Sequence, residues 1–282
     1  MGKNKENKGG IAMLRTDLAL EAKELWEKSA ERTTQLEGVR AREQGNLTRV
    51  DILDDRGAKA LGKPVGSYVT MELPSFDRDV RKAAEELAQA LQDLTGLEEK
   101  DSVLVVGLGN RAVTPDALGP QTVDRVFLTR HLIRGLPDSF GSCRSVSGVA
   151  PGVLATTGVE SLELVRGAAE HVKPHCILCV DALAAGSMDR LCRTVQLSDA
   201  GIAPGSGVGN CRAAFSKDSL SVPVYAIGVP TVVDGGSDRP MILTPRDIDE
   251  QIRYLSRVLA GGINLFLHPN FAYDDFTQFV PM

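Results

Sequence analysis

Two apolar runs constrain the fold of this chain more than any other feature of its sequence. Residues 102–108 and 176–180 have the length and composition of buried strands, and each leads toward a carboxylate, Asp116 or Asp181, in a turn of small residues. In an open α/β sheet, ligands bind just outside the carboxyl ends of the strands. Both acids are therefore expected where chemistry is usually performed.

The rest of the chain alternates between strand-like and helix-like patterns. We expect helices over residues 76–94, 117–132, 158–172 and 245–264, with strands over residues 46–54, 66–73, 144–150, 192–197 and 222–228. Continuous apolar strands that alternate with helices indicate a sheet covered on both faces. The predicted fold class is α/β, with a largely parallel or mixed sheet flanked by helices.

Composition excludes several classes of protein. The 282 residues are 43% hydrophobic and 24% charged, which is typical of a folded globular chain. A formal net charge of −5 gives no support for a basic nucleic-acid footprint over the whole chain, so no direct nucleic-acid partner is expected. No apolar h-region follows the polar first residues, so we expect no secretory signal. No apolar stretch approaches about 18 residues, so no membrane partner is expected either.

The cysteines favour a packing role in a reducing compartment. There are five, and Cys176 and Cys179 form a C-x-x-C pattern, which in other settings marks a redox or zinc half-site. Here the pattern lies within an apolar run, where free cysteine behaves as a small hydrophobe. No second C-x-x-C follows it, and an odd number of cysteines does not suggest a disulfide framework.

As a pair, Asp116 and Asp181 could perform acid–base catalysis that neither could perform alone. Alone, Asp116 would cap a helix that begins at Ala117, and Asp181 would shape a turn. Within a few ångströms of each other, two buried carboxylates cannot both ionise easily, so they share a proton. The ionised member can then take a proton from water, while the protonated member binds a peptide carbonyl and later protonates the leaving amine.

Two alternatives stay open at this point. Residues 107–112 match G-x-G-x-x-A, the pattern of a nucleotide-binding module, although Pro115 would interrupt the helix that this fingerprint requires. The histidines show no H-E-x-x-H spacing, and His268 falls in a tail-like segment, so we expect no cofactor and no metal. A metal-assisted peptidase with the acids as ligands of a hard cation is the remaining alternative.

Several motifs together resemble the germination proteases of spore-forming bacteria, peptidase family A25. The resemblance spans about residues 13–270 and is most specific in TPDALGP and APGSGVGN. The matching segments are RTDLALEAKEL (15–25), TPDALGP (114–120), VDALAA (180–185), APGSGVGN (203–210), YAIGVPTVVD (225–234) and TPRDID (244–249).

The resemblance implies a fold similar to that of hydrogenase-maturation proteases and an endopeptidase that degrades small acid-soluble spore proteins in the spore core during germination. The family's two catalytic aspartates fall on Asp116 and Asp181. The resemblance also implies a homotetramer that is made as a zymogen and trimmed autocatalytically between Asp17 and Leu18. Residues 1–17 are thus expected to be a flexible propeptide-like segment and residues 18–282 a single α/β peptidase domain.

One departure from the family pattern lies near the C-terminal end of the resemblance. Between Val233 and Thr244 this chain has only a short link, where other family members carry a much longer segment. Both aspartates remain, so we expect a shortened but active protease.

Overall fold

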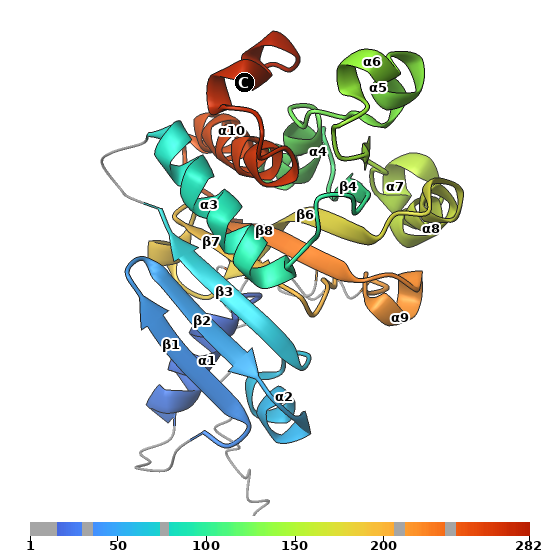
Figure 1. Cartoon of the computed structure of the whole chain (residues 1–282). Coiled ribbons are helices and arrows are strands. Elements are labelled where there is room, and N and C mark those ends of the chain that lie inside the picture. Colours follow the sequence, from blue (N-terminus) through green and yellow to red (C-terminus); the bar gives the residue numbers. More distant parts are fainter. Residues whose placement is uncertain (1–15, 30–35, 74–78, 206–211, 235–240) are drawn as a thin grey trace, which may run out of the picture.

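The fold is a mixed nine-stranded sheet with helices on both faces (Figure 1). The structure is a computed structural model that describes residues 16–29, 36–73, 79–205, 212–234 and 241–282. The strands are β1 (Val39–Gln44), β2 (Leu47–Ile52), β3 (Gly66–Glu72), β4 (Val103–Gly107), β5 (Val146–Val149), β6 (Cys176–Ala185), β7 (Thr194–Ser198), β8 (Val224–Asp234) and β9 (Ile242–Leu243).

Strand order divides the sheet into a parallel part and an antiparallel part. The order is β1-β2-β3-β7-β8-β6-β4-β5, and β9 pairs with β8. The pairs β8–β6, β6–β4 and β4–β5 are parallel, whereas all other pairs are antiparallel. The predicted fold class is confirmed in its mixed form. The antiparallel strands β8 and β9 come directly before and after the short link that follows Val233 in the sequence.

The helices vary from single turns to five turns. They are α1 (Ala19–Ser29), α2 (Asp55–Leu61), α3 (Val80–Thr95), α4 (Leu118–Val123), α5 (Arg130–Gly135), α6 (Pro137–Phe140), α7 (Leu154–Thr157), α8 (Ser161–Val172), α9 (Lys217–Leu220) and α10 (Ile248–Leu267), with 3-10 turns η1 (Thr114–Asp116), η2 (Met188–Arg190) and η4 (Tyr273–Gln278). Within the described part of the chain, no helix is both long and apolar enough to cross a membrane.

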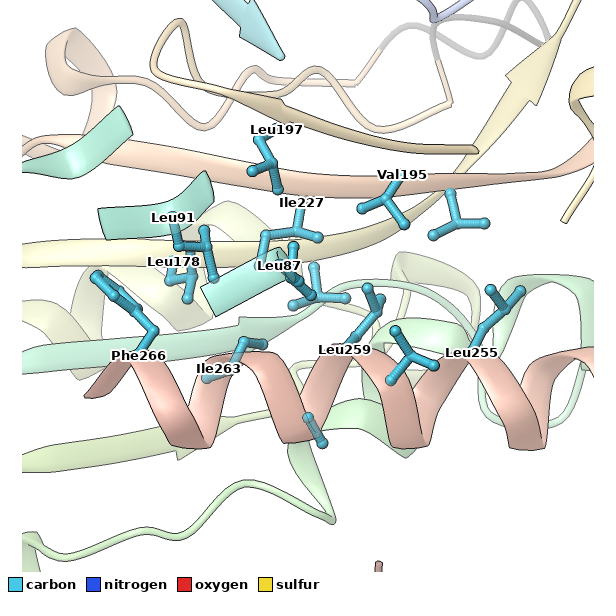
Figure 2. Packing of buried hydrophobic residues seen from close by; sticks show 14 of the residues in the cluster. Leu87, Leu91, Leu178, Val195, Leu197, Ile227, Leu255, Leu259, Ile263 and Phe266 are labelled. Carbon is cyan, nitrogen blue, oxygen red and sulfur yellow. The ribbon is translucent and has the colours of Figure 1, made fainter. Parts of the chain in front are cut away.

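The larger core lies between the sheet and the helices α3 and α10, which run side by side over one face (Figure 1). Apolar side chains recur along α10 at intervals of three or four residues and point toward the strands (Figure 2). The labelled contacts are Leu255, Leu259, Ile263 and Phe266 of α10, Leu87 and Leu91 of α3, and Leu178, Val195, Leu197 and Ile227 of the strands. This core fixes β6, β7 and β8 against one another.

A second core covers the opposite face of the parallel strands and includes α8. Residues that alternate along a strand point to opposite faces, and three positions separate Cys176 from Cys179. Cys176 accordingly packs in the α3–α10 core and Cys179 in the α8 core. Both are buried free cysteines, and burial raises the pKa of each thiol. The two sulfurs cannot serve one metal or redox site, which supports the packing interpretation.

The helix predicted over residues 117–132 is wrong, because tertiary contacts break it. The helix α4 ends at Val123 and α5 begins at Arg130. Between them, Phe127 donates its N–H to the side chain of Asn264 at 2.8 Å and packs against His268. His268 is therefore buried at the end of α10 rather than lying in a tail, and burial lowers its pKa to about 4, so it is neutral.

Candidate functional site

Asp181 lies inside β6, at the point where the neighbouring strand β4 stops. The last residue of β4, Gly107, pairs with Val180, while β6 itself continues to Ala185. The prediction that Asp181 occupies a turn after its strand is therefore wrong, although it does lie at the carboxyl edge of β4. The Asp181 side chain is only 4% exposed and accepts a hydrogen bond from the Ala182 N–H at 2.9 Å.

Asp116 reaches the same edge from the loop that follows β4. Its carboxylate accepts the Asn110 N–H at 2.8 Å, and this bond closes the loop on itself. Gly109 allows the close approach, because it has φ of 115° and a Cβ there would lie 2.0 Å from the Asp116 carbonyl oxygen. Asp116 does not cap a helix: α4 begins after Ala117, without a side-chain cap.

A second glycine presses this loop onto the strand ends. A Cβ on Gly119 would lie 2.3 Å from the Leu108 carbonyl oxygen and 2.5 Å from that of Val180. No larger residue fits between the start of α4 and the two parallel strands. The small residues of the TPDALGP segment thus bring Asp116 toward Asp181.

Both acids line one cavity of about 440 Å³. The cavity wall also includes Asp17 from the N-terminal segment and Arg212, which follows the glycine-rich residues 203–210. Residues 206–211 of that segment lie outside the described residues. The structure therefore brings together the two acids that the strand-end argument selected, and it adds a cation, Arg212, that the sequence analysis missed.

Burial and mutual repulsion favour a proton on this pair. Burial raises the pKa of Asp181 well above its usual range, and the nearby carboxylates of Asp116 and Asp17 raise it further. Burial also raises the pKa of Asp116, against the opposing effects of the Asn110 N–H and the Arg212 charge. Asp181, the more deeply buried acid, is the member that keeps its proton to higher pH.

The expected processing bond, Asp17–Leu18, lies beside this cavity. Asp17 donates its N–H to the Ala184 carbonyl at 2.9 Å, and its carboxylate accepts the Ala184 N–H at 2.9 Å. Leu18 is completely buried among apolar residues that include Leu183 and Leu191. Residues 1–15 of the expected propeptide-like segment lie outside the described residues.

The geometry disfavours the nucleotide-binding alternative. A dinucleotide fingerprint requires a helix that starts directly after the glycine turn, with free N–H groups for the pyrophosphate. Here β4 is followed by the 3-10 turn η1, and the Asn110 N–H is already bound to Asp116. Considering only the described residues, no group of three or more His, Cys, Asp or Glu side chains is placed to hold a metal ion.

Comparison with known proteins identifies the family of this chain. The sequence profile described as germination protease matches residues 19–238, which is most of the chain. The chain belongs to the germination protease family. It is therefore a peptidase, and the family places it in spore germination.

Curated germination proteases are similar over most of this chain. That of Caldanaerobacter subterraneus subsp. tengcongensis is 40% identical over 320 residues, covering 94% of this chain and 97% of the relative. That of Clostridium perfringens (strain ATCC 13124) is 36% identical over 323 residues, covering 95% and 99%. Since the chain has 282 residues, these longer alignments contain gaps in it.

Among solved structures, a NiFe hydrogenase maturation protease, HycI from Thermococcus kodakarensis, is similar at 19% sequence identity. The match covers 62% of this chain and 96% of the solved chain, with a TM-score of 0.37. A similarity at that score supports no argument about this site. The mixed α/β sheet is established by the strands themselves.

Replacing Asp181 by asparagine should stabilise the folded chain at neutral pH. The pKa of Asp181 is higher in the folded chain than its ordinary value of 3.8. The contribution of this group to the free energy of unfolding is therefore fully present below pH 3.8 and is lost as pH rises through the folded pKa. The amide of Asp181→Asn does not ionise, so we expect Tm at about pH 7 to rise by at least about 2 °C, with little difference at about pH 4. Scanning calorimetry measures both, and an equal Tm difference at the two pH values would contradict the raised pKa.

Proposed function

We propose that this protein is an endopeptidase that degrades small acid-soluble spore proteins, with Asp116 and Asp181 as its catalytic pair. One observation supports the proposal above all: the two acids line a common cavity, and burial favours a proton on Asp181. Membership of the germination protease family supports the protein substrate. From the family resemblance we also propose that it acts as a homotetramer in the cytoplasm of the spore core.

The proposed mechanism divides the chemistry between an ionised and a protonated carboxyl. Asp116, with the smaller tendency to hold a proton, takes one from a water molecule whose oxygen attacks the scissile carbonyl carbon. Protonated Asp181 donates a hydrogen bond to the carbonyl oxygen as negative charge develops there. When the tetrahedral intermediate collapses, the C–N bond breaks and Asp181 gives its proton to the leaving amine. The proton that Asp116 took from water then moves to Asp181, which restores the pair.

We further propose that the chain is made as a zymogen and cuts its own Asp17–Leu18 bond. Asp17 occupies part of the cavity wall and is joined to β6 through both hydrogen bonds with Ala184. A protein substrate and this segment would compete for the same space. Removal of the residues before Leu18 therefore frees the cavity.

The two acids are tested by separate replacement. Asp116→Asn and Asp181→Asn should each lower cleavage of a purified small acid-soluble spore protein by at least about 10²-fold, because an amide can neither accept the water proton nor donate as an acid. Asp138→Asn, an exposed change on α6, is the matched control and should retain full activity. Full activity in either cavity variant would contradict the proposed pair.

Zymogen control is tested by shortening the chain. A form that begins at Leu18 should cleave the spore protein without a lag, because Asp17 no longer forms part of the cavity wall. A form that lacks only residues 1–10 keeps this segment and should show the lag of the full chain. A folded but inactive form beginning at Leu18, with folding checked by circular dichroism, would contradict the proposal.

A further inference from the structure

The main chain on both sides of the Asp17–Leu18 bond is held by one side chain, Gln196 of β7. Its Nε2 donates to the Asp17 carbonyl oxygen at 3.1 Å, and its Oε1 accepts the Ala19 N–H at 2.7 Å. Gln196 is 7% exposed, so little water competes for the amide. Both ends of this buried amide are thus used on a single short stretch of backbone.

Sheet register places Gln196 in line with Asp181. Gln196 pairs with Gly228 of β8, and Gly228 pairs on its other side with Asp181. Directly paired residues in adjacent strands point to the same face, and two strand spacings amount to about 10 Å. Gly228 has no side chain between the two, and a Cβ there would lie 2.4 Å from Leu183. The amide of Gln196 and the carboxyl of Asp181 therefore project from the same row of the sheet.

Further contacts hold this segment against the rest of the fold. The Lys63 ammonium donates to the Thr16 carbonyl at 2.8 Å, and Ala184 exchanges two hydrogen bonds with Asp17. The Leu18 side chain fills an apolar pocket formed by Leu183, Ala185, Leu191 and Val233. The segment bends at Asp17 and leads directly into α1, and its backbone hydrogen bonds and side-chain pocket are contacts of the kind that proteins use to bind peptides.

We propose that Gln196 is a substrate-binding residue that orients the Asp17–Leu18 bond for cutting. The inference rests on the proposed function, in which that bond is cut by Asp116 and Asp181. The Gln196 Nε2–H touches the carbonyl oxygen that becomes negatively charged when water adds to the carbon, so it stabilises that charge. A carbonyl oxygen has two lone pairs, so the bond from Gln196 leaves one that can accept a hydrogen bond from protonated Asp181.

Self-cleavage of the full chain tests this role. Gln196→Met has a similar length but neither donates nor accepts, and it should slow the appearance of the new N-terminus at Leu18 by at least about tenfold, followed by mass spectrometry. Gln92→Met, an exposed change on α3, is the matched control and should cut at the wild-type rate. Equal rates in wild type and Gln196→Met would overturn the proposal.

A second measurement distinguishes the loss of the Gln196 contact with Ala19 from a general loss of structure in the sheet. In a chain that also carries Asp181→Asn, and so keeps its N-terminal segment, Gln196→Met should speed amide hydrogen exchange at Ala19 but not in β6 or β8. Faster exchange throughout these strands would assign Gln196 a structural role and overturn the proposal.

The variant Gln196→Glu provides a separate test, the pH dependence of its cleavage rate, which is informative even if Gln196→Met does not fold. An ionised glutamate still accepts the Ala19 N–H but has no proton for the Asp17 carbonyl, whereas a protonated one donates again. Its cleavage rate relative to wild type should therefore recover as pH falls, and a ratio that does not change with pH would count against the role. A wild-type chain that never cuts Asp17–Leu18 would instead contradict the proposed self-processing.

Discussion

The burial of a carboxyl group at the edge of the parallel strands is the constraint on which this site depends. Moving an ionised carboxylate out of water is costly unless it is paired with a cation. Asp181 is 4% exposed and is repelled by the charge of Asp116, and both effects raise its pKa and favour the protonated form. The packing around it enforces the burial. Gly119 lets the loop after β4 lie directly on the strand ends, and the α3–α10 core holds β6 in place from the other face.

The N-terminal segment is part of the same arrangement. Thr16 and Asp17 are bound to Lys63, Ala184 and Gln196, and Leu18 completes an apolar cluster beneath them. These contacts bring a peptide bond to the cavity that holds the two acids. Under the proposed function, regulation and substrate binding would use the same groups.

The sequence allowed the acids to be found because their local patterns are strong. Continuous apolar strands are typical of a parallel sheet, and they drew attention to Asp116 and Asp181. Asp181 lies at the sheet edge because β4 ends beside it, whereas its own strand β6 continues to Ala185. Gln196 could not be found in this way. Its importance comes from pairing with Gly228, which joins β7 to β8 in antiparallel register, and no linear pattern specifies that neighbour. Arg212 was missed because no linear pattern places it at the same cavity as Asp116 and Asp181.

Local patterns also failed where tertiary contacts decide the backbone. The break near Phe127 depends on the Asn264 amide, which is distant in sequence, and the burial of His268 depends on the same contact region. The strand β1 was missed because nearly all its residues are exposed and polar, so it has no apolar signal. In each case the missing information is long-range.

The most direct test of the account is a carboxyl-carbon NMR titration of Asp181, in the full chain and in the Asp116→Asn variant. A shared proton predicts that Asp181 titrates well above the ordinary value of 3.8 and that its apparent pKa falls when Asp116 loses its charge. An Asp181 that titrates near the ordinary value, and at the same pH in both proteins, would contradict the central claim.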